Sequence, residues 1–377
     1  ILLEAVRRGA SDVHFEPYEH RYRIRLRLDG MLRETAAPPL RLAPRIASRL
    51  KVMAGLDIAE KRTPQDGRLK LRLGGGRAVD FRVSSLPTLF GEKLVLRLLD
   101  GAAASLDLEA LGLEDEQKRL YLDAIERPYG MVLVTGPTGS GKTVSLYAAL
   151  QRLNCAERNI STVEDPVEIR LDGVNQVQRH DKRGMSFATA LRAFLRQDPD
   201  VIMVGEIRDP ETAEIAIKAA QTGHMVLSTL HTNDAPQSVA RLLNMGVAPY
   251  NLVASLSLVV AQRLVRRLCE RCRRPLALPR HALHEAGFDE AAIEAGLQLY
   301  EAVGCADCNE GYRGRTGVYQ VMPMLEPIQR IVLAGGSALD IAEAARRAGL
   351  PDLREAALRK AARGITSLAE IARVISR

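Results

Sequence analysis

The octet GPTGSGKT at residues 136–143 constrains this chain more than any other stretch. It follows an apolar run at 131–135 that predicts a buried strand, and it precedes a helix-compatible segment at 144–153. Glycines at such a junction let backbone N–H groups close around a polyphosphate, and the helix N-terminus adds positive partial charge. A plain turn would not need Lys-Thr at its end. We predict nucleoside triphosphate binding by Gly136, Pro137, Thr138, Gly139, Ser140, Gly141, Lys142 and Thr143, with Thr143 also holding Mg²⁺.

The length and composition are those of a globular protein with more than one domain. A chain of 377 residues exceeds one ordinary core, so two or three domains are expected. Hydrophobic residues at 46% and charged residues at 26% are ordinary values. No apolar run reaches the length of a membrane span, and no signal peptide opens the chain. Because residue 1 is Ile and not Met, we expect a fragment that lacks an upstream domain.

The net charge leaves two interpretations open. Lys and Arg number 53 against 46 Asp and Glu, which gives +7 and a pI near 9.3. This excess suits nucleic acid or an anionic membrane, but it also suits a nucleotide enzyme with arginines that face phosphate. Aromatic residues make up only 4%, with no Trp, which argues against stacking platforms for single strands.

Residues 1–100 are predicted to form a small α+β domain. Short strands are expected at 12–16, 22–28, 69–73, 78–83 and 94–99, with helices at 1–8 and 45–54. In the second strand apolar residues alternate with Arg21, Arg23, Arg25 and Arg27, which predicts a half-buried strand with a basic outer face. Arg82 and Arg97 lie on later strands, where a solvated face is their default explanation.

A linker is expected at 101–112, because it begins with small residues and has no periodicity. From 113 to 377, long helices alternate with short apolar strands, at 131–135, 160–163, 201–204 and 225–229. Unbroken apolar strands separated by helices predict a parallel sheet covered on both faces, and hence an α/β, RecA-like fold. After Leu252 we expect helices, interrupted by a Cys-rich insert at 265–320 and ending in a helical region at 321–377.

Acidic residues follow two of the predicted core strands. Glu206 closes the strand at 201–204, and Glu164 and Glu168 follow the strand at 160–163. Ligands bind open α/β sheets at the carboxyl ends of their strands. We therefore predict that Glu206 belongs to the Mg²⁺ shell and that Glu168 polarises the attacking water, although spacing does not separate Glu168 from Glu164.

Two histidines and three arginines are further candidates. His224 and His231 bracket the strand at 225–229, and we expect both at the phosphate edge of the sheet, where they would sense the γ-phosphate. Arg192, Arg196 and Arg208 crowd the segment 186–208. They are either surface charges or arginine fingers that face a neighbouring subunit, and the sequence does not separate these alternatives.

The cysteines indicate a metal site. Two CxxC pairs, Cys269/Cys272 and Cys305/Cys308, predict a structural Zn²⁺ bound by four thiolates. A redox pair would explain either CxxC alone but not both. Cys155 is left over, and we expect it in the core.

Together these motifs resemble those of the secretion-superfamily ATPases of type II secretion and type IV pili. The matching stretches are GPTGSGKT at 136–143, EDPVE at 164–168, GEIRD at 205–209, TGHMVLSTLHTND at 222–234 and the tetracysteine insert, and the resemblance runs from ASDVHFEP at 10–17 onward. Within the family, RQDPDVIMVGEIRDPETAEIA, LLNMGVAPYN and GCADCNEGYRGRTGVYQV look most like the pilus extension (assembly) ATPase. The insert disfavours the retraction ATPase.

The resemblance implies roles for individual residues. It implies a hexameric ring of two-domain subunits, in which a PAS-like first domain and a RecA-like domain hold ATP between them. It makes Glu206 the Walker B acid and Glu168 the water-activating glutamate, and it places His224 and His231 in a histidine box. It implies that Arg82 and Arg97 reach the phosphates. The arginines that it places near nucleotide or subunit interfaces are Arg192, Arg196, Arg208 and Arg313.

The leading hypothesis is therefore a cytoplasmic, Mg²⁺-dependent ATPase at the inner membrane that acts on a pilus platform protein and adds pilin subunits. The missing upstream domain is expected to be needed for docking. A type II secretion ATPase is the alternative. A nucleic-acid translocase ranks lower, and no nucleic-acid partner is expected. A nucleotide-dependent assembly scaffold without turnover is a further, non-enzymatic hypothesis.

Overall fold

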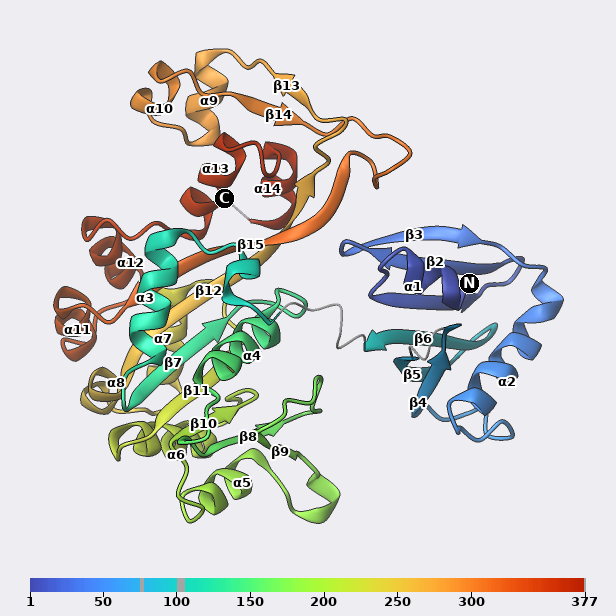
Figure 1. The fold of residues 1–377 in the computed structure, drawn as a ribbon, viewed down its shortest axis with the longest axis horizontal. Coiled ribbons are helices and arrows are strands. Elements are labelled where there is room, and N and C mark those ends of the chain that lie inside the picture. Colours follow the sequence, from blue (N-terminus) through green and yellow to red (C-terminus); the bar gives the residue numbers. More distant parts are fainter. Residues whose placement is uncertain (75–77, 100–105, 376–377) are drawn as a thin grey trace. The chain divides into compact units, whose positions relative to one another are not determined.

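The computed structural model describes residues 1–74, 78–99 and 106–375 (Figure 1). It divides into two compact units, Ile1–Ala104 and Ser105–Arg377. The first five residues of the predicted linker, 101–105, lie outside the described residues. Within the described ranges, no helix combines the length and apolar composition that crossing a bilayer requires.

The first unit is a six-stranded antiparallel sheet with helices against one face. Its elements are α1 (Leu2–Arg7), β1 (Asp12–Pro17), β2 (Tyr22–Leu28), β3 (Met31–Ala36), η1 (Leu40–Leu42), α2 (Ala43–Met53), β4 (Gln65–Arg72), β5 (Ala78–Thr88) and β6 (Gly91–Leu99), with strand order β3-β2-β1-β6-β5-β4. Alternate residues of β2, including Tyr22 and Ile24, are buried in the core that α2 covers. The predicted alternation is confirmed.

The other face of this sheet carries charges that neutralise one another. Arg25 donates to both carboxylate oxygens of Glu16, at 2.8 and 2.9 Å. Arg97 donates to Asp12 at 2.9 Å. Both acids lie on β1, next to β2 and β6 in the sheet. The basic outer face expected from the β2 arginines is therefore paired with acids from the neighbouring strand.

We expect the Glu16 carboxylate to stabilise the first unit, and we expect this stabilisation to be lost in acid. Burial raises the pKa of Glu16, but hydrogen bonds from Arg25 and Lys93 outweigh it and lower this pKa to about 2 from 4.5. A carboxylate with a depressed folded pKa stabilises the fold fully above its unfolded pKa and loses that contribution as pH falls toward 2. Glu16→Gln should therefore lower the free energy of unfolding by on the order of 2–3 kcal/mol at pH 6, and by much less near pH 2.

Hydrogen exchange of β1 and β2 amides across this pH range measures the effect. Glu19→Gln is the control, because Glu19 is exposed and, in the part of the chain that the structure describes, its ion-pair partner is the likewise exposed His20. A difference between wild type and Glu16→Gln that stayed constant from pH 6 to 2 would contradict the prediction.

The second unit is a seven-stranded sheet between helical layers. The elements before the last sheet strands are η3 (Leu108–Leu111), α3 (Asp115–Ile125), β7 (Gly130–Thr135), α4 (Lys142–Leu153), β8 (Ile160–Glu164), β9 (Asn175–Gln178), η4 (Asp181–Arg183), α5 (Phe187–Phe194), β10 (Val201–Val204), α6 (Pro210–Gln221), β11 (Met225–Leu230), α7 (Ala235–Asn244) and α8 (Pro249–Ser255). The remaining elements are β12 (Leu256–Leu268), β13 (Arg274–Leu276), α9 (Arg280–Ala286), α10 (Glu290–Glu294), β14 (Leu299–Glu301), β15 (Tyr312–Pro323), α11 (Glu326–Leu333), α12 (Ala338–Arg347), α13 (Leu353–Ala362) and α14 (Leu368–Val374).

The sheet order is β15-β12-β7-β11-β10-β8-β9, and every neighbouring pair is parallel except β12–β15. In β7, Met131 and Leu133 face one core while Val132 and Val134 face another. Figure 1 shows α3 and α4 on one side of the sheet and α6 and α8 on the other. The predicted sheet with two covered faces, and with it the α/β fold, is confirmed.

The expectation of helices directly after Leu252 is wrong. Helix α8 ends at Ser255, and the next thirteen residues form β12. A continuous apolar run does not distinguish a buried strand from a buried helix, and β12 is buried along most of its length between β7 and β15. β12 and β15 also extend into the predicted insert at 265–320, so the segment between these strands is 269–311.

The second half of the predicted linker is folded onto the second unit. Leu108 and Leu111 are buried in η3. Tyr319 of β15 donates to the Leu111 carbonyl at 3.0 Å, and Lys360 of α13 donates to the Gly112 carbonyl at 2.7 Å. The segment at the start of the second unit is therefore held in place by side chains of β15 and α13, which come late in the chain.

Candidate functional site

The glycine-rich octet connects β7 to α4, as the sequence predicts. Gly136 and Gly141 have φ of 148° and 91°. A Cβ at Gly136 would lie 2.5 Å from the Gln262 carbonyl oxygen, and a Cβ at Gly141 would lie 2.8 Å from Gln262 Nε2. Only glycine fits at both positions, because a side chain would collide with β12. The loop thus presents bare backbone at the N-terminus of a helix, which is the arrangement that binds phosphate.

Lys142 and Thr143 are the first two residues of α4. Lys142 Nζ donates to the carbonyls of Gly136 at 2.8 Å and Pro137 at 3.1 Å. Burial lowers the pKa of Lys142 to about 8, and the nearby Glu206 carboxylate opposes this shift. Thr143 is exposed. The Lys142 ammonium group therefore folds back onto the backbone of the loop, and the neighbouring Thr143 is open to solvent.

Glu206 follows β10, and its side chain is only 11% exposed. Its Oε1 lies 2.5 Å from Arg208 Nη2, and its Oε2 lies 3.3 Å from His231 Nε2. Among the described residues, Oε2 has no hydrogen-bond partner despite its burial. A buried carboxylate oxygen with spare acceptor capacity near Lys142 suits a hard cation such as Mg²⁺. The donor set of Glu206 and Thr143 therefore fits this metal.

The two glutamates of the EDPVE stretch have different surroundings. Glu164 is buried, and its carboxylate accepts from Thr162 at 2.7 Å and Gln176 at 3.1 Å and is bonded to the Tyr147 hydroxyl. Burial raises the pKa of Glu164 against these bonds. Glu168 is exposed, and within the described part of the chain its carboxylate has no partner. Only Glu168 has a carboxylate free to meet a water molecule.

The expectation that both histidines lie at the phosphate edge is wrong for His224. β11 runs parallel to β7, with Met225 opposite Gly130 and Leu230 opposite Thr135. His224 therefore lies at the amino ends of the strands, about 20 Å along the strand from the phosphate loop, and its Nδ1 is 3.0 Å from the Ala219 carbonyl. Residues that bracket a strand necessarily lie at opposite ends of it. Of the two histidines, it is His231 that contacts Glu206.

The predicted arginines have varied surroundings. Arg208 contacts Glu206, whereas Arg192 donates to Glu211 at 2.6 Å and Arg196 to the Arg192 carbonyl at 2.8 Å. Arg313 is exposed at the start of β15. In the first unit, Arg82 is exposed on β5 and lies opposite Arg97 in the sheet.

Three residues beside the phosphate loop were not singled out from the sequence. Gln262 donates to the Ser140 carbonyl at 2.7 Å and accepts from Ser145 at 2.8 Å. Arg263 is half-buried, bonded to the Asn233 carbonyl at 2.9 Å, and close enough to lower the pKa of Lys142. Tyr147 of α4 contacts the EDPVE loop. For Gln262 and Arg263 the available signal is a polar pair inside an apolar run, but the sequence predicts a helix there and so gives the pair no place beside the loop.

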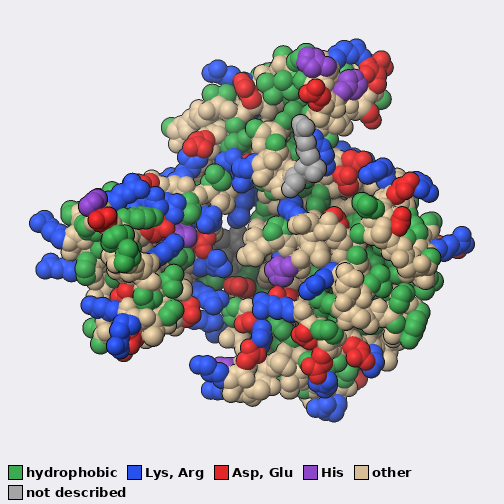
Figure 2. Space-filling view, turned by 180° about the vertical axis from the view of Figure 1, so that it is seen from behind, with side chains coloured by type: hydrophobic (Ala, Val, Ile, Leu, Met, Phe, Trp, Pro, Cys, Tyr) green, Lys and Arg blue, Asp and Glu red, His purple; other side chains and the backbone are tan. Residues whose placement is uncertain are grey.

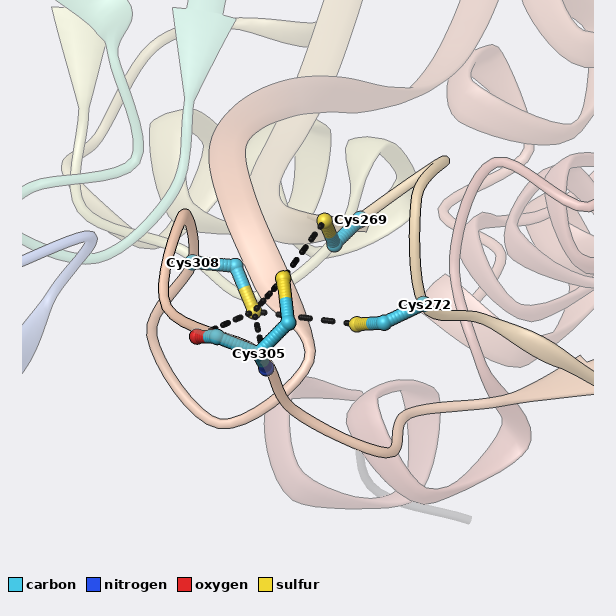
Figure 3. Close-up of side chains that lie close together, drawn as sticks. All are labelled: Cys269, Cys272, Cys305 and Cys308. Carbon is cyan, nitrogen blue, oxygen red and sulfur yellow. Dashed lines mark hydrogen bonds between the residues drawn. The ribbon is translucent and has the colours of Figure 1, made fainter.

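The four CxxC cysteines converge at the ends of β12 and β15 (Figure 3). Their sulfur atoms lie within 4.8 Å of one another, with separations of 3.9 Å for Cys269–Cys305, 3.7 Å for Cys272–Cys308 and 3.6 Å for Cys305–Cys308. Zn–S bonds of about 2.3 Å in a tetrahedron require sulfurs about 3.8 Å apart. The thiols therefore fit a zinc ion. Cys155 is exposed, so its expected place in the core is wrong.

Comparisons with known proteins agree with this architecture. The Legionella pneumophila ATPase DotB has the same fold, with a TM-score of 0.67, 22% identity, and coverage of 98% of this chain and 92% of that one. The pilus retraction motor PilT, solved with bound ADP, also has this fold, with a TM-score of 0.64 and 24% identity. That match covers 98% of this chain and 94% of the PilT chain. These likenesses and the octet between β7 and α4 establish the RecA-like phosphate-loop fold.

Curated relatives are much closer in sequence. The type IV pilus assembly ATPase PilB of Acinetobacter baylyi is 59% identical, over 100% of this chain and 65% of its own length. The PilB of Pseudomonas aeruginosa is 58% identical, over 99% of this chain and 66% of its own length. The type II secretion system protein E of Dickeya dadantii is 50% identical over 99% and 74%. This chain thus spans about two thirds of the pilus relatives. The family model for "Type II/IV secretion system protein" matches residues 1–373, so the chain belongs to that family.

Proposed function

We propose that this chain is the motor part of a Mg²⁺-dependent ATPase that drives type IV pilus assembly. The observation that carries the proposal is one sheet edge: the phosphate loop follows β7, Glu206 with its orphaned oxygen follows β10, and the segment with the free Glu168 carboxylate follows β8, all at the carboxyl ends of parallel strands. The assembly ATPases at 55–59% identity support the pilus function over type II secretion, whose proteins match at 49–51%.

The proposed reaction assigns a role to each group. Backbone N–H groups of the loop and Lys142 bind the β- and γ-phosphates of ATP. Glu206 and Thr143 would hold Mg²⁺, which neutralises phosphate charge when bound. Glu168 orients a water molecule and accepts its proton as the water oxygen bonds to the γ-phosphorus. The bond from this phosphorus to the β–γ bridging oxygen breaks, which releases ADP and phosphate. Arg208 and His231 hold the Glu206 carboxylate in place.

The remaining assignments extend this proposal beyond one subunit. A homo-hexamer would let arginines of one subunit stabilise phosphate bound to its neighbour, and the candidates are Arg82, Arg97, Arg192, Arg196 and Arg313. We place His224 outside the phosphate contacts of its own subunit. The proposed partner is an inner-membrane platform protein, and the proposed location is the cytoplasmic side of that membrane. The proposed occupant of the four thiols is one structural Zn²⁺.

A chimera tests the pilus function against type II secretion. Residues 1–377 would replace the matching stretch of the Acinetobacter baylyi assembly ATPase and, separately, that of the Dickeya dadantii type II protein. Restored pili in the first strain, without restored secretion in the second, is the expected result. The opposite pattern would overturn the pilus assignment.

An ATP turnover assay with added DNA tests the nucleic-acid alternative. Figure 2 shows groups of Lys and Arg alternating with Asp and Glu on the visible face, without a continuous basic surface. Aromatic residues, which stack on the bases of single strands, make up only 4% of the chain. We expect single- and double-stranded DNA to change turnover by less than about twofold. Strong stimulation with a steep salt dependence would favour a translocase.

A further inference from the structure

Tyr147 joins the helix after the phosphate loop to the segment that carries Glu168. It lies on α4, five residues after Lys142, and its side chain is fully buried. Its hydroxyl donates to Glu164 Oε2. The same oxygen accepts from the backbone N–H of Glu168 at 3.3 Å and of Ile169 at 3.4 Å. One oxygen atom thus contacts both glutamates of the EDPVE stretch.

Glu164 and Gln176 complete this network. Glu164 Oε1 accepts from Thr162 and from Gln176 Nε2, and Gln176 Nε2 also donates to the Ile169 carbonyl at 2.9 Å. Gln176 Oε1 accepts from the Leu171 N–H at 2.8 Å. The backbone of 168–171 is therefore held by Tyr147 of α4 and Gln176 of β9, and Glu164 of β8 bonds to both of these side chains. The Glu168 carboxylate itself remains free of partners among the described residues.

We propose that Tyr147 is a positioning residue that sets where Glu168 stands relative to the phosphate loop, with Glu164 as its support. The inference rests on the proposed hydrolytic function of this site. α4 begins at Lys142, so a single rigid helix fixes the ammonium at one point and the Glu168 backbone at another. Misplacement of a reacting group by about 1 Å can cost about 10²-fold in rate.

Tyr147→Phe is the variant that isolates this role. The ring still fills its place in the core, but the N–H groups of Glu168 and Ile169 lose their acceptor. We expect kcat for ATP hydrolysis to fall about 10- to 100-fold, with KM and the affinity for a non-hydrolysable ATP analogue within about twofold of wild type.

Tyr121→Phe is the matched control. Tyr121 is also fully buried in the same core, and its hydroxyl donates to the Ser145 carbonyl of α4 at 3.1 Å, without contact to Glu164 or Glu168. It should change kcat by less than about twofold. Equal losses in the two variants would overturn the inference, because the effect would then be a general one on the core.

A double-variant comparison separates positioning from a merely structural role. If Tyr147 acts through Glu168, Tyr147→Phe should leave the residual rate of Glu168→Gln within about twofold. The same 10- to 100-fold loss in both backgrounds would overturn the inference.

Amide hydrogen exchange tests the contact without any activity. Residues 168 and 169 should exchange at least about tenfold faster in Tyr147→Phe than in wild type, while amides of β7 stay unchanged. Unaltered exchange at these two residues would overturn the inference. A wild-type chain that hydrolyses no ATP would instead count against the proposed function, so the two failures are distinguishable.

Discussion

Replacing Glu168 by Gln should lower the rate of ATP hydrolysis by about 10²–10⁴-fold, the range typical of a lost general base. Glutamine keeps the length of the side chain but does not accept a proton from water. Nucleotide affinity should stay within about twofold, because the proposed phosphate contacts come from Lys142 and the loop backbone and not from Glu168. Steady-state phosphate release measures the first effect, and titration with a fluorescent ATP analogue measures the second.

Asp172→Asn is the control for Glu168→Gln. Asp172 is an exposed acid of the same loop, and its carbonyl, not its carboxylate, accepts from Asn154. It should change turnover by less than about twofold. Hydrolysis at the wild-type rate by Glu168→Gln would show that another group activates the water.

Removal of zinc should be the largest single loss of stability. Zinc sites in small peptides contribute about 10–16 kcal/mol of apparent binding free energy. We expect about one zinc per chain by metal analysis. The double variant Cys272→Ser/Cys308→Ser should bind none, because only two thiolates remain. Hydrogen exchange should then rise in 269–311 before it rises in the phosphate loop, because the cysteines lie beyond the ends of β12 and β15.

Cys155→Ser is the matched control, since Cys155 is exposed and lies outside the thiol cluster. It should keep full zinc content and wild-type exchange. A folded chain that contains no metal would contradict the zinc assignment.

Short-range patterns were enough to predict the centre of the second unit. The phosphate loop, the strands before it and around Glu206, and the paired CxxC motifs each depend on a spacing that one kind of structure satisfies. β12 was missed because its apolar run has no period, and burial on both faces removes the alternation that marks a strand. Gln262 and Arg263 were missed with it.

The choice between Glu164 and Glu168 depended on contacts between distant residues. Both glutamates come at the end of the same predicted strand, so their spacing does not tell which of them activates the water molecule. Tyr147 of α4 and Gln176 of β9 donate hydrogen bonds to the Glu164 carboxylate. These contacts join elements that are separate in the sequence, so they become visible only in the folded structure. His224 shows a different kind of error. The sequence already placed it before a strand and His231 after it, and parallel geometry puts those ends far apart.

The thiol cluster also makes 273–304 a suitable place for a handle. Cys272 and Cys305 flank this segment, and their sulfur atoms lie within 4.8 Å of each other, so its two ends are close together. Lengthening a loop whose ends are fixed costs only about 0.6 kcal/mol per doubling. Gly296 is an exposed residue between α10 and β14. A short peptide tag inserted there would offer an attachment point for fluorescence or optical-trap measurements, far along the chain from the groups proposed to cleave ATP.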